Sequence, residues 1–215
     1  RKGNVLSNDH KTWFVTGGTG LIGSHVIRAV LALPGVDVIA LVRGESHAAA
    51  RARLTSVLTT AGVDEHALTR LSVLAGDLAE PQLGLDVSSW AGLVELVEVI
   101  VHSGAIVNWL DPYAALRSAN VLGTAEVLRL AAAGSRDPTL VALSTVGTAG
   151  WTENDLQPFE NMLSSSGYAL SKWVAEQLVA RALARGAIRG VIVRPGMVTG
   201  CSETGVCNPT DFVSR

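Results

Sequence analysis

Tyr168 and Lys172 stand four residues apart and could share acid–base chemistry. The surrounding pattern predicts a helix over residues 168–185, and side chains four apart on a helix lie on one face. A cation beside a phenol stabilises the phenolate, lowering the tyrosine pKa from about 10 toward working pH. The pair is therefore predicted to donate a proton to a carbonyl under reduction, the alternative being an exposed helix face.

A hydroxyl for the same reaction follows the strand predicted over residues 139–144. Thr145 comes directly after this strand and can hydrogen-bond the oxygen that Tyr168 protonates. Ser144 is the alternative for that role, although its place in the strand favours a side chain that faces the interior. The predicted catalytic set is Thr145, Tyr168 and Lys172.

Glycines at positions 17, 18, 20 and 23 separate a strand-like segment from an apolar-periodic helix that begins at Leu21. Gly17 and Gly18 can take the positive φ of a tight turn, Gly20 lets backbone approach a diphosphate, and Gly23 lets the helix lie close to the strand. The unpaired N–H groups of the first helical turn can hold phosphate. In this strand–helix context, the spacing favours dinucleotide binding over a simple turn.

Arg43 lies at the end of the next predicted strand, 20 residues beyond Gly23. An NAD site usually has a carboxylate near this position, whereas a cation fits the 2′-phosphate of NADP. The alternative is a solvated loop arginine. Arg53 would either assist Arg43 or be a surface residue, and Asp77 would either accept from the adenine amino group or close a turn.

Two further polar residues lie in predicted elements. Asn120 falls in the middle of a helix, where a buried amide must be hydrogen-bonded. It either positions Lys172 through water or has a purely structural role. His102 ends a strand and is predicted to be a satisfied structural histidine, because the five histidines have no metal-ligand spacing. No metal is expected.

Strand and helix patterns alternate along the chain, which predicts an α/β doubly wound parallel sheet with strand order 3-2-1-4-5-6, a Rossmann fold. Strands are expected over residues 13–16, 36–42, 71–75, 98–102, 139–144 and 190–193. Helices are expected over residues 21–33, 48–61, 64–69, 90–97, about 111–133 and 168–185. Residues 81–89 are expected to be a loop, and 147–166 an active-site loop.

Composition excludes several classes of protein. The chain has 215 residues, of which 48% are hydrophobic and 17% charged, which suits a parallel sheet covered on both faces. The net charge of −2 gives no basic footprint for nucleic acid. No apolar run of membrane-spanning length occurs, so a cytoplasmic location is expected. Cys201 and Cys207 fit no zinc pattern and are expected to be free thiols.

Together these motifs resemble the extended short-chain dehydrogenase/reductase superfamily. The resemblance is carried by TGGTGLIG (16–23), Gly76-Asp77-Leu78, Ser144-Thr145, Tyr168-Ala-Leu-Ser-Lys172 and Arg194-Pro195-Gly196. Three longer stretches look like the thioester reductase branch, the terminal reductase domains of nonribosomal peptide and polyketide synthetases, which are related to carboxylic acid reductases and fatty acyl-CoA reductases. They are HSGAIVNWLDPYAALRSANVLGTAEVLRLA (102–131), GYALSKWVAEQLV (167–179) and VRPGMVTGCSETGVCNPTDF (193–212).

The resemblance implies NADPH-dependent reduction of an acyl or peptidyl thioester held on the phosphopantetheine of a carrier protein, giving an aldehyde and, after a second hydride, an alcohol. Lys172 would hold the nicotinamide ribose. The implied cofactor contacts are Thr16, Gly17, Gly18, Thr19, Gly20, Leu21, Ile22, Gly23, Arg43, Arg53, Asp77, Leu78, Ser103, Gly104, Ala105, Tyr168, Lys172, Pro195, Gly196, Met197 and Val198.

The resemblance also implies a domain organisation. It assigns 12–200 to the NADP-binding domain and 201–215 to the start of a substrate-binding subdomain that is otherwise missing. Residues 1–11 are polar and without pattern, and are expected to be a linker or lead-in. The domain is expected to be monomeric within a larger multidomain chain.

Two other functions compete with this hypothesis. The first is an NAD(P)-dependent sugar-nucleotide epimerase or dehydratase of the same superfamily, which would prefer an acidic residue at position 43. The second is a catalytically silent NADP-sensing scaffold, which would have no use for Thr145, Tyr168 and Lys172.

Overall fold

The alternation of strand and helix produces one six-stranded parallel sheet with the order β3-β2-β1-β4-β5-β6. The computed structural model describes residues 10–150 and 156–198. The fold class and the strand order agree with the sequence-based expectation. The strands are β1 (Lys11–Thr16), β2 (Val36–Val42), β3 (Leu71–Ala75), β4 (Val97–His102), β5 (Thr139–Leu143) and β6 (Arg189–Val193).

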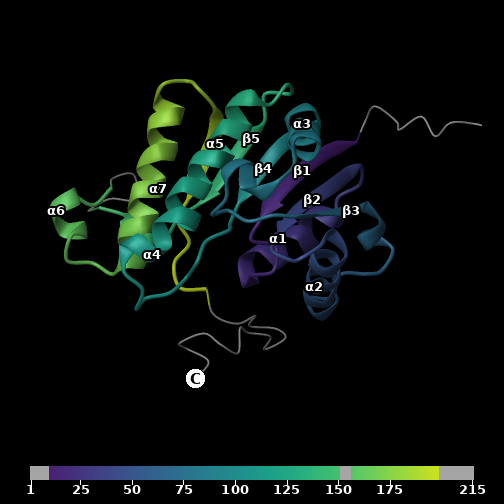
Figure 1. Cartoon of the computed structure of the whole chain (residues 1–215), viewed down its shortest axis with the longest axis horizontal. Coiled ribbons are helices and arrows are strands. Elements are labelled where there is room, and N and C mark those ends of the chain that lie inside the picture. Colours follow the sequence, from purple (N-terminus) through teal and green to yellow (C-terminus); the bar gives the residue numbers. More distant parts are fainter. Residues whose placement is uncertain (1–9, 151–155, 199–215) are drawn as a thin grey trace, which may run out of the picture.

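Helices cover both faces of the sheet. Figure 1 places α7 at one end of the molecule and α2 with β3 at the other. The α-helices are α1 (Leu21–Leu31), α2 (His47–Thr60), α3 (Val87–Leu96), α4 (Tyr113–Arg117), α5 (Gly123–Ala133), α6 (Phe159–Met162) and α7 (Gly167–Ala184). A π-helical turn, η3 (Ser118–Leu122), joins α4 to α5, and the 3₁₀ turns are η1 (Ala67–Arg70), η2 (Pro81–Gly84) and η4 (Val146–Thr148).

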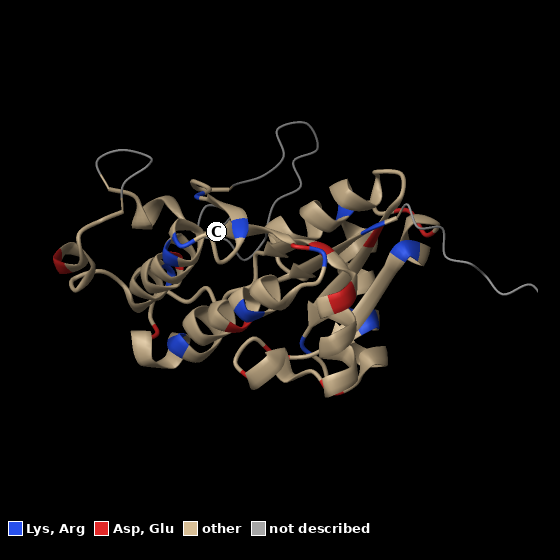
Figure 2. Ribbon diagram, turned by 90° about the horizontal axis from the view of Figure 1, so that it is seen from above, with Lys and Arg blue, Asp and Glu red and all other residues tan. Residues whose placement is uncertain are grey.

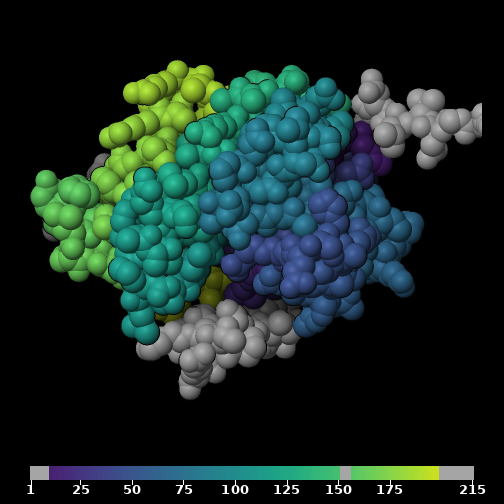
Figure 3. Space-filling view, viewed as in Figure 1, coloured from purple at the N-terminus to yellow at the C-terminus, as the bar shows by residue number. Residues whose placement is uncertain are grey.

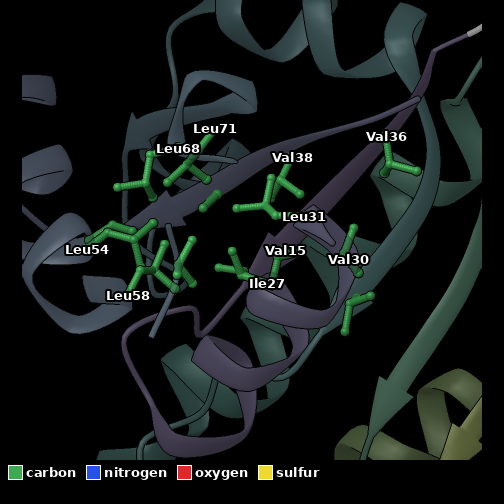
Figure 4. Close-up of a cluster of buried hydrophobic side chains, with 14 of the residues drawn as sticks. Val15, Ile27, Val30, Leu31, Val36, Val38, Leu54, Leu58, Leu68 and Leu71 are labelled. Carbon is green, nitrogen blue, oxygen red and sulfur yellow. The ribbon is translucent and has the colours of Figure 1, made fainter. Parts of the chain in front are cut away.

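The central strand β1 supplies the two halves of the core from neighbouring residues. Val15 packs with side chains from α1 and α2 (Figure 4), whereas Phe14 packs with side chains from α3, α5 and α7. Both residues are 0% exposed. Because successive side chains of a strand point to opposite faces, this pattern requires helices on both sides of β1.

Helix α2 is held by a narrow apolar stripe. Its buried residues, Ala50, Leu54 and Leu58, are spaced four apart and therefore lie on one face. Ser46 caps the helix, since its hydroxyl accepts the N–H of Ala49 at 3.2 Å. Basic and acidic residues are spread over many elements of the described part of the chain (Figure 2), which fits the small net charge.

Two segments expected to be loops contain helical structure. Residues 81–89 form the turn η2 and the start of α3, because Oδ1 of Asp86 accepts the N–H of Ser89 at 2.7 Å and so caps that helix. Within 147–166, Phe159–Met162 form α6. Residues 151–155 of that segment lie outside the described part.

The helix expected over residues 111–133 is also different, because η3 interrupts it. The interruption coincides with two tight contacts. Asn120 is buried and bonds to Ile106, and a Cβ on Gly123 would come within 2.6 Å of the Leu78 carbonyl oxygen. An extra residue in a helical turn changes which side chains face inward, a local effect typical of π turns.

The edges of the fold differ slightly from the expectation. Strand β1 begins at Lys11, the last residue assigned to the lead-in. Residues 1–9 and 201–215, with Cys201 and Cys207, lie outside the described part. Within residues 10–150 and 156–198, no helix combines the length and apolarity needed to cross a membrane.

Leu54 and Leu110 offer a matched test of the core. We expect Leu54→Ala to lower the free energy of unfolding by roughly 2–5 kcal/mol, because it leaves a cavity at a side chain that is 0% exposed. Leu110 is 94% exposed, so Leu110→Ala should change stability by about 0.5 kcal/mol or less. Urea denaturation measures both, and equal effects would contradict the assigned packing of α2.

Candidate active site

A cleft of about 540 Å³ opens at the carboxyl ends of the strands. Figure 3 shows it as a hollow between the teal segment around α4 and the purple-blue segment around α1. Of the residues predicted to bind cofactor or to act in catalysis, only Gly18 and Lys172 do not line it. Those that do are Thr16, Gly17, Thr19, Gly20, Leu21, Ile22, Gly23, Arg43, Arg53, Asp77, Leu78, Ser103, Gly104, Ala105, Thr145, Tyr168, Pro195, Gly196, Met197 and Val198.

The turn after β1 brings backbone against backbone. Gly17 has φ +77°, and a Cβ there would come within 2.6 Å of the Gly104 nitrogen. A Cβ on Gly23 would come within 2.1 Å of the Gly17 carbonyl oxygen. Gly18 does not have the positive φ expected of it, and it faces away from the cleft, toward Ile27 on α1. The glycines thus make a smooth wall to which a diphosphate can come close.

The N-terminus of α1 is free of competing groups. Its N-cap is Gly20, which supplies no side-chain acceptor, and its first turn carries no acidic residue. The unpaired N–H groups of that turn, at the positive end of the helix dipole, are therefore available to an anion at the cleft. This arrangement fits the phosphates of a dinucleotide.

A buried histidine fixes the floor of the glycine turn. Thr16 Oγ1 accepts the N–H of Gly104 at 3.1 Å and lies 2.8 Å from Nδ1 of His102. The Thr124 hydroxyl donates to the Asn120 carbonyl at 2.7 Å, so it must accept from Nε2 of His102, 3.0 Å away. This network assigns the proton to Nε2.

His102 therefore has the structural role that its strand-end position suggested. Burial, aided by the positive charge of Lys172, lowers the pKa of His102 to about 3. The ring is neutral at physiological pH, and both nitrogens have partners. It holds β1 and β4 to the helix behind them.

Arg43 and Arg53 meet at the end of β2. Both are exposed and line the cleft. Nη1 of Arg53 donates to the Arg43 carbonyl at 3.3 Å, so the guanidinium of Arg53, on α2, lies against the backbone of Arg43. The two side chains place positive charge at the end of β2, the strand next to β1, which carries the glycine turn.

Asp77 has a turn role while lining the cleft. Its Oδ1 accepts the N–H of Ala79 at 2.9 Å, and its own N–H donates to the Leu83 carbonyl at 2.8 Å. One carboxylate oxygen is thus used locally, as expected for an aspartate that closes a turn.

The hydroxyls of Ser144 and Thr145 face different surroundings. Ser144 donates to the carboxylate of Glu176 in the interior, as its strand position suggested. Thr145 is half-buried and lines the cleft, and its Oγ1 accepts the N–H of Gly147 at 3.3 Å. Since that bond uses a lone pair, the hydroxyl hydrogen of Thr145 is left to donate toward the cleft.

Tyr168 reaches the same cleft from α7, with burial to 9% exposure. The expectation that its pKa is lowered is wrong for this structure. Burial raises the pKa of Tyr168, because the phenolate would lose hydration. At neutral pH the side chain is therefore a protonated phenol, the form that can donate.

Lys172 lies behind the cleft. It is 7% exposed, and Nζ donates to the carbonyl of Leu143, the last residue of β5, at 2.6 Å. Burial lowers the pKa of Lys172 to about 8, against the opposing effect of the Glu176 carboxylate, which raises it. A lysine with this pKa is mostly protonated at neutral pH.

Asn120 joins three segments around the site. Its Oδ1 accepts the N–H of Ile106 at 2.7 Å, and its Nδ2 donates to the Ile106 carbonyl at 3.0 Å and to Ser171 Oγ at 2.9 Å. Of the two roles considered, these contacts favour the structural one. The amide ties the segment after β4 to α7, one residue before Lys172.

Sequence reasoning missed part of the cleft wall. Trp109 is 64% exposed, and its ring meets that of Tyr168 edge-on, with centroids 5.1 Å apart. A tryptophan shortly after a strand end, in a segment without helical periodicity, was an available signal. The other lining residues not predicted for the cofactor or catalysis are Leu41, Val42, Gly76, Ile106, Val107 and Ala119, and Ser144, considered as the alternative to Thr145, also lines the cleft.

Among the described residues, no group of three or more His, Cys, Asp or Glu side chains is placed to hold a metal ion.

Gly23 and Gly92 are a matched pair for testing the glycine wall. Gly23→Ala would force a Cβ against the Gly17 carbonyl, so we expect binding of the dinucleotide NADPH to weaken by roughly 10-fold or more. At Gly92, in α3, an added Cβ would have nothing within 4 Å, so Gly92→Ala should leave binding unchanged. NADPH fluorescence titration measures both, and unchanged binding by Gly23→Ala would contradict the assigned phosphate wall.

Sequence comparison identifies relatives over most of the chain. A family model described as "Male sterility protein", for an NAD-binding domain, matches residues 15–215. The L-2-aminoadipate reductase large subunit of Penicillium chrysogenum is 38% identical over 98% of this chain. A linear gramicidin synthase polypeptide of Brevibacillus parabrevis is 41% identical over 94% of it. The chain covers only 16% and 4% of these two proteins.

Solved structures agree with this relationship. The terminal R domain from the myxalamid PKS-NRPS biosynthetic pathway superposes with a TM-score of 0.88 at 35% identity, covering 97% of this chain and 55% of that one. The reductase domain of a nonribosomal peptide synthetase from Mycobacterium tuberculosis gives a TM-score of 0.72 at 31% identity, covering 90% and 50%. The UDP-glucuronic acid 4-epimerase of Bacillus cereus, at 22% identity and a TM-score of 0.65, shares the fold.

The chain therefore belongs to the NAD-binding family described as male sterility protein, together with the terminal reductase domains of nonribosomal peptide synthetases and the L-2-aminoadipate reductases.

Proposed function

We propose that this chain forms the NADP(H)-binding core of a reductase that releases a carrier-bound acyl or peptidyl thioester as an aldehyde. The observation that carries the proposal is that Thr145 and Tyr168 both line the cleft walled by the glycine turn. These residues come from the end of β5 and from α7, so only the folded chain brings them together. A second reduction in the same cleft would give the alcohol.

The side chains have separate tasks in this reaction. NADPH, when bound, would supply the hydride that reaches the thioester carbonyl carbon. Thr145 donates a hydrogen bond to the oxygen on which negative charge develops, and Tyr168 gives that oxygen its proton. The C–S bond of the resulting hemithioacetal then breaks as the proton of its hydroxyl passes to the sulfur, so that the aldehyde forms and the thiol leaves on the carrier arm.

Lys172 acts from behind the cleft. Its ammonium is buried, so its charge is weakly screened and stabilises negative charge as the phenol of Tyr168 loses its proton. The contact with the nicotinamide ribose that the resemblance implies would need Nζ to leave the Leu143 carbonyl, because Lys172 does not line the cleft. Pro195, Gly196 and Met197 line the cleft after β6 and would form the wall on the nicotinamide side.

The choice of NADP over NAD rests on charge. Arg43 and Arg53 stand at the end of β2, where the ribose 2′ position of a dinucleotide on the glycine turn would lie. Two guanidinium groups favour a 2′-phosphate, and neither offers an acceptor for a free 2′-hydroxyl.

The partner follows from the reaction and from the relatives. The two related sequences are named for an aminoadipate reductase and a gramicidin synthase, and both are much longer than this chain. We propose that residues 12–200 bind the cofactor, that 201–215 begin a substrate-binding subdomain, and that the thioester arrives on a carrier protein. A monomeric domain in a multidomain chain suffices for this.

The two competing functions have less support. An epimerase or dehydratase would share the fold, but Arg43 and Arg53 are unsuited to the hydroxyl of NAD. A silent sensor would not need both Thr145 and Tyr168 to face one cleft.

The two tyrosines of the chain provide the test of mechanism. We expect Tyr168→Phe, in the full-length protein that carries this chain, to lower kcat for NADPH-dependent thioester reduction by roughly 10²-fold or more, because the proton donor is lost. Its Kd for NADPH should be nearly unchanged. Tyr113→Phe, in α4, is the control and should keep its activity.

The assay uses acyl-CoA or acyl-carrier thioesters, follows NADPH oxidation and identifies the product by mass spectrometry. A wild-type protein that oxidises no NADPH with any thioester would end the proposed function. Full activity of Tyr168→Phe would end only the role of this phenol.

Arg43→Ala tests the cofactor choice. We expect the Kd for NADPH to rise by about 10-fold or more while that for NADH changes little, because only NADPH has the 2′-phosphate that the guanidinium would meet. Arg129→Ala, on the exposed side of α5, should change neither value. Fluorescence titration with both nucleotides measures this, and an unchanged preference would place the 2′-phosphate contact elsewhere.

A further inference from the structure

Glu176 is a buried carboxylate that the reaction described above does not use. It lies on α7, one turn beyond Lys172, and its side chain is 1% exposed. A buried charge is costly unless it is paired and hydrogen-bonded, and Glu176 is both.

One oxygen of Glu176 holds the end of β5. Oε2 accepts the hydroxyl of Ser144 and lies 2.7 Å from Oγ1 of Thr148. Thr148 is 0% exposed, and its Oγ1 also lies 2.7 Å from the carbonyl oxygen of Thr145. The carboxylate therefore fixes Ser144 and Thr148, which lie on either side of Thr145 in the chain. Thr145 is the residue whose hydroxyl faces the cleft.

The other oxygen holds the end of β6. Nε of Arg194 donates to Oε1 of Glu176 at 2.8 Å, and Nη2 donates to the same atom. The next residue, Pro195, accepts the N–H of Val146 through its carbonyl at 3.2 Å. Residues 195–198 form one wall of the cleft, so Glu176 reaches that wall through Arg194.

Lys172 completes the arrangement on the same helix. Successive turns of α7 hold successive residues of the β5 end, since Lys172 bonds to Leu143 and Glu176 to Ser144. The charged and titratable groups around Lys172 are Glu176 and Tyr168 of its own helix, His102 of β4, and Arg194 beyond Glu176. His102 is neutral, so Glu176 supplies the negative charge nearest to the ammonium.

We propose that Glu176 is a positioning residue of the active site, which locks the β5 end with Thr145 and the β6 end with residues 195–198 onto the helix that carries Tyr168 and Lys172. It touches neither the substrate nor the cofactor. This inference rests on the proposed function for its kinetic consequences, whereas the contacts themselves are independent of it.

Two substitutions of Glu176 test separately the length of its side chain and its negative charge. Glu176→Asp keeps the charge but is one methylene shorter, so it cannot hold both strand ends, and we expect kcat to fall by roughly 10-fold or more with the Kd for NADPH little changed. Glu176→Gln keeps the reach but loses the charge. We expect the kcat of this variant to fall as well. In its pH profile, the loss of kcat at high pH should begin about one pH unit lower than in wild type.

The direction of that shift follows from the field at Lys172. The carboxylate raises the lysine pKa, which stands at about 8 with Glu176 present. Removing the negative charge makes the ammonium lose its proton at lower pH. Glu176→Asp should leave the limb in place, a difference that a merely stabilising role would not produce.

Glu126→Gln is the matched control. Glu126 is also a mostly buried helical glutamate paired with an arginine, Arg129, but it bonds to Gln82 and lies outside the cleft. Its substitution should leave kcat and the pH profile unchanged. Thr148→Val is a second probe that leaves no charge unpaired, and we expect kcat to fall by about 10-fold because it removes the one hydroxyl hydrogen that Oε2 of Glu176 and the Thr145 carbonyl share, both 2.7 Å from Oγ1.

Hydrogen exchange gives a readout without any reaction. Amides of residues 144–148, 194 and 196–198 should exchange faster in Glu176→Asp and Thr148→Val than in wild type or Glu126→Gln, while those of residues 16–23 should not. If wild type reduces no thioester, the proposed function fails and the exchange data still decide this inference. The inference is overturned if Thr148→Val and Glu176→Asp both keep the kcat and the exchange rates of the wild type. It is also overturned if the variants lose kcat only in proportion to their folded fraction and Glu176→Gln shows no shift of the high-pH limb.

Discussion

The site depends on one backbone contact, the approach of Gly17 to Gly104 where β1 and β4 lie side by side. In this strand order the chain leaves β1 toward one face of the sheet and β4 toward the other, so the turns diverge and a crevice opens between them. The missing Cβ atoms allow the two turns to touch at their base. The bond from Gly104 to Thr16 fixes that contact, and His102 holds Thr16 from below.

Behind this crevice the chain uses buried polar groups where a simpler core would use hydrophobic ones. Glu176, Lys172 and His102 are each less than 10% exposed, and removing either member of a buried charge pair generally costs more than the pair itself contributes. Stability alone does not explain the arrangement. Its geometric result is that two strand ends, one turn and one helix have a single relative placement, which is what a hydroxyl and a phenol need if they are to meet one oxygen.

The strands and the site residues that follow them could be predicted because their signals are local. Apolar β-branched runs mark the strands, and each polar or glycine residue at a strand end faces the same edge of a parallel sheet. The π turn, the start of α3 at Asp86 and the short α6 could not be placed in this way. The π turn depends on contacts such as that of Asn120 with Ile106, which join residues distant from the local pattern. The start of α3 does have a local signal, the bond from the Ser89 N–H to Asp86, which the loop expectation overlooked.

The role of Glu176 was out of reach for the same reason. In the sequence it is one more polar residue of a helix. Only the hydrogen bonds from Ser144 and Arg194, which follow β5 and β6, show that it joins two strand ends. Trp109 was accessible in principle, but its meaning depends on the ring of Tyr168, 59 residues further along the chain.

The Tyr168 phenol shows why spacing alone predicts the wrong pKa direction. The four-residue interval to Lys172 suggests a stabilised phenolate, yet Nζ of Lys172 bonds to Leu143 while burial keeps the phenol protonated. This is the useful state for a proton donor, because a phenolate could not protonate an oxyanion. As the proton leaves, the charge of Lys172 acts through the protein interior, where it is weakly screened. The lysine therefore stabilises the Tyr168 phenolate that proton transfer produces, without deprotonating the phenol beforehand.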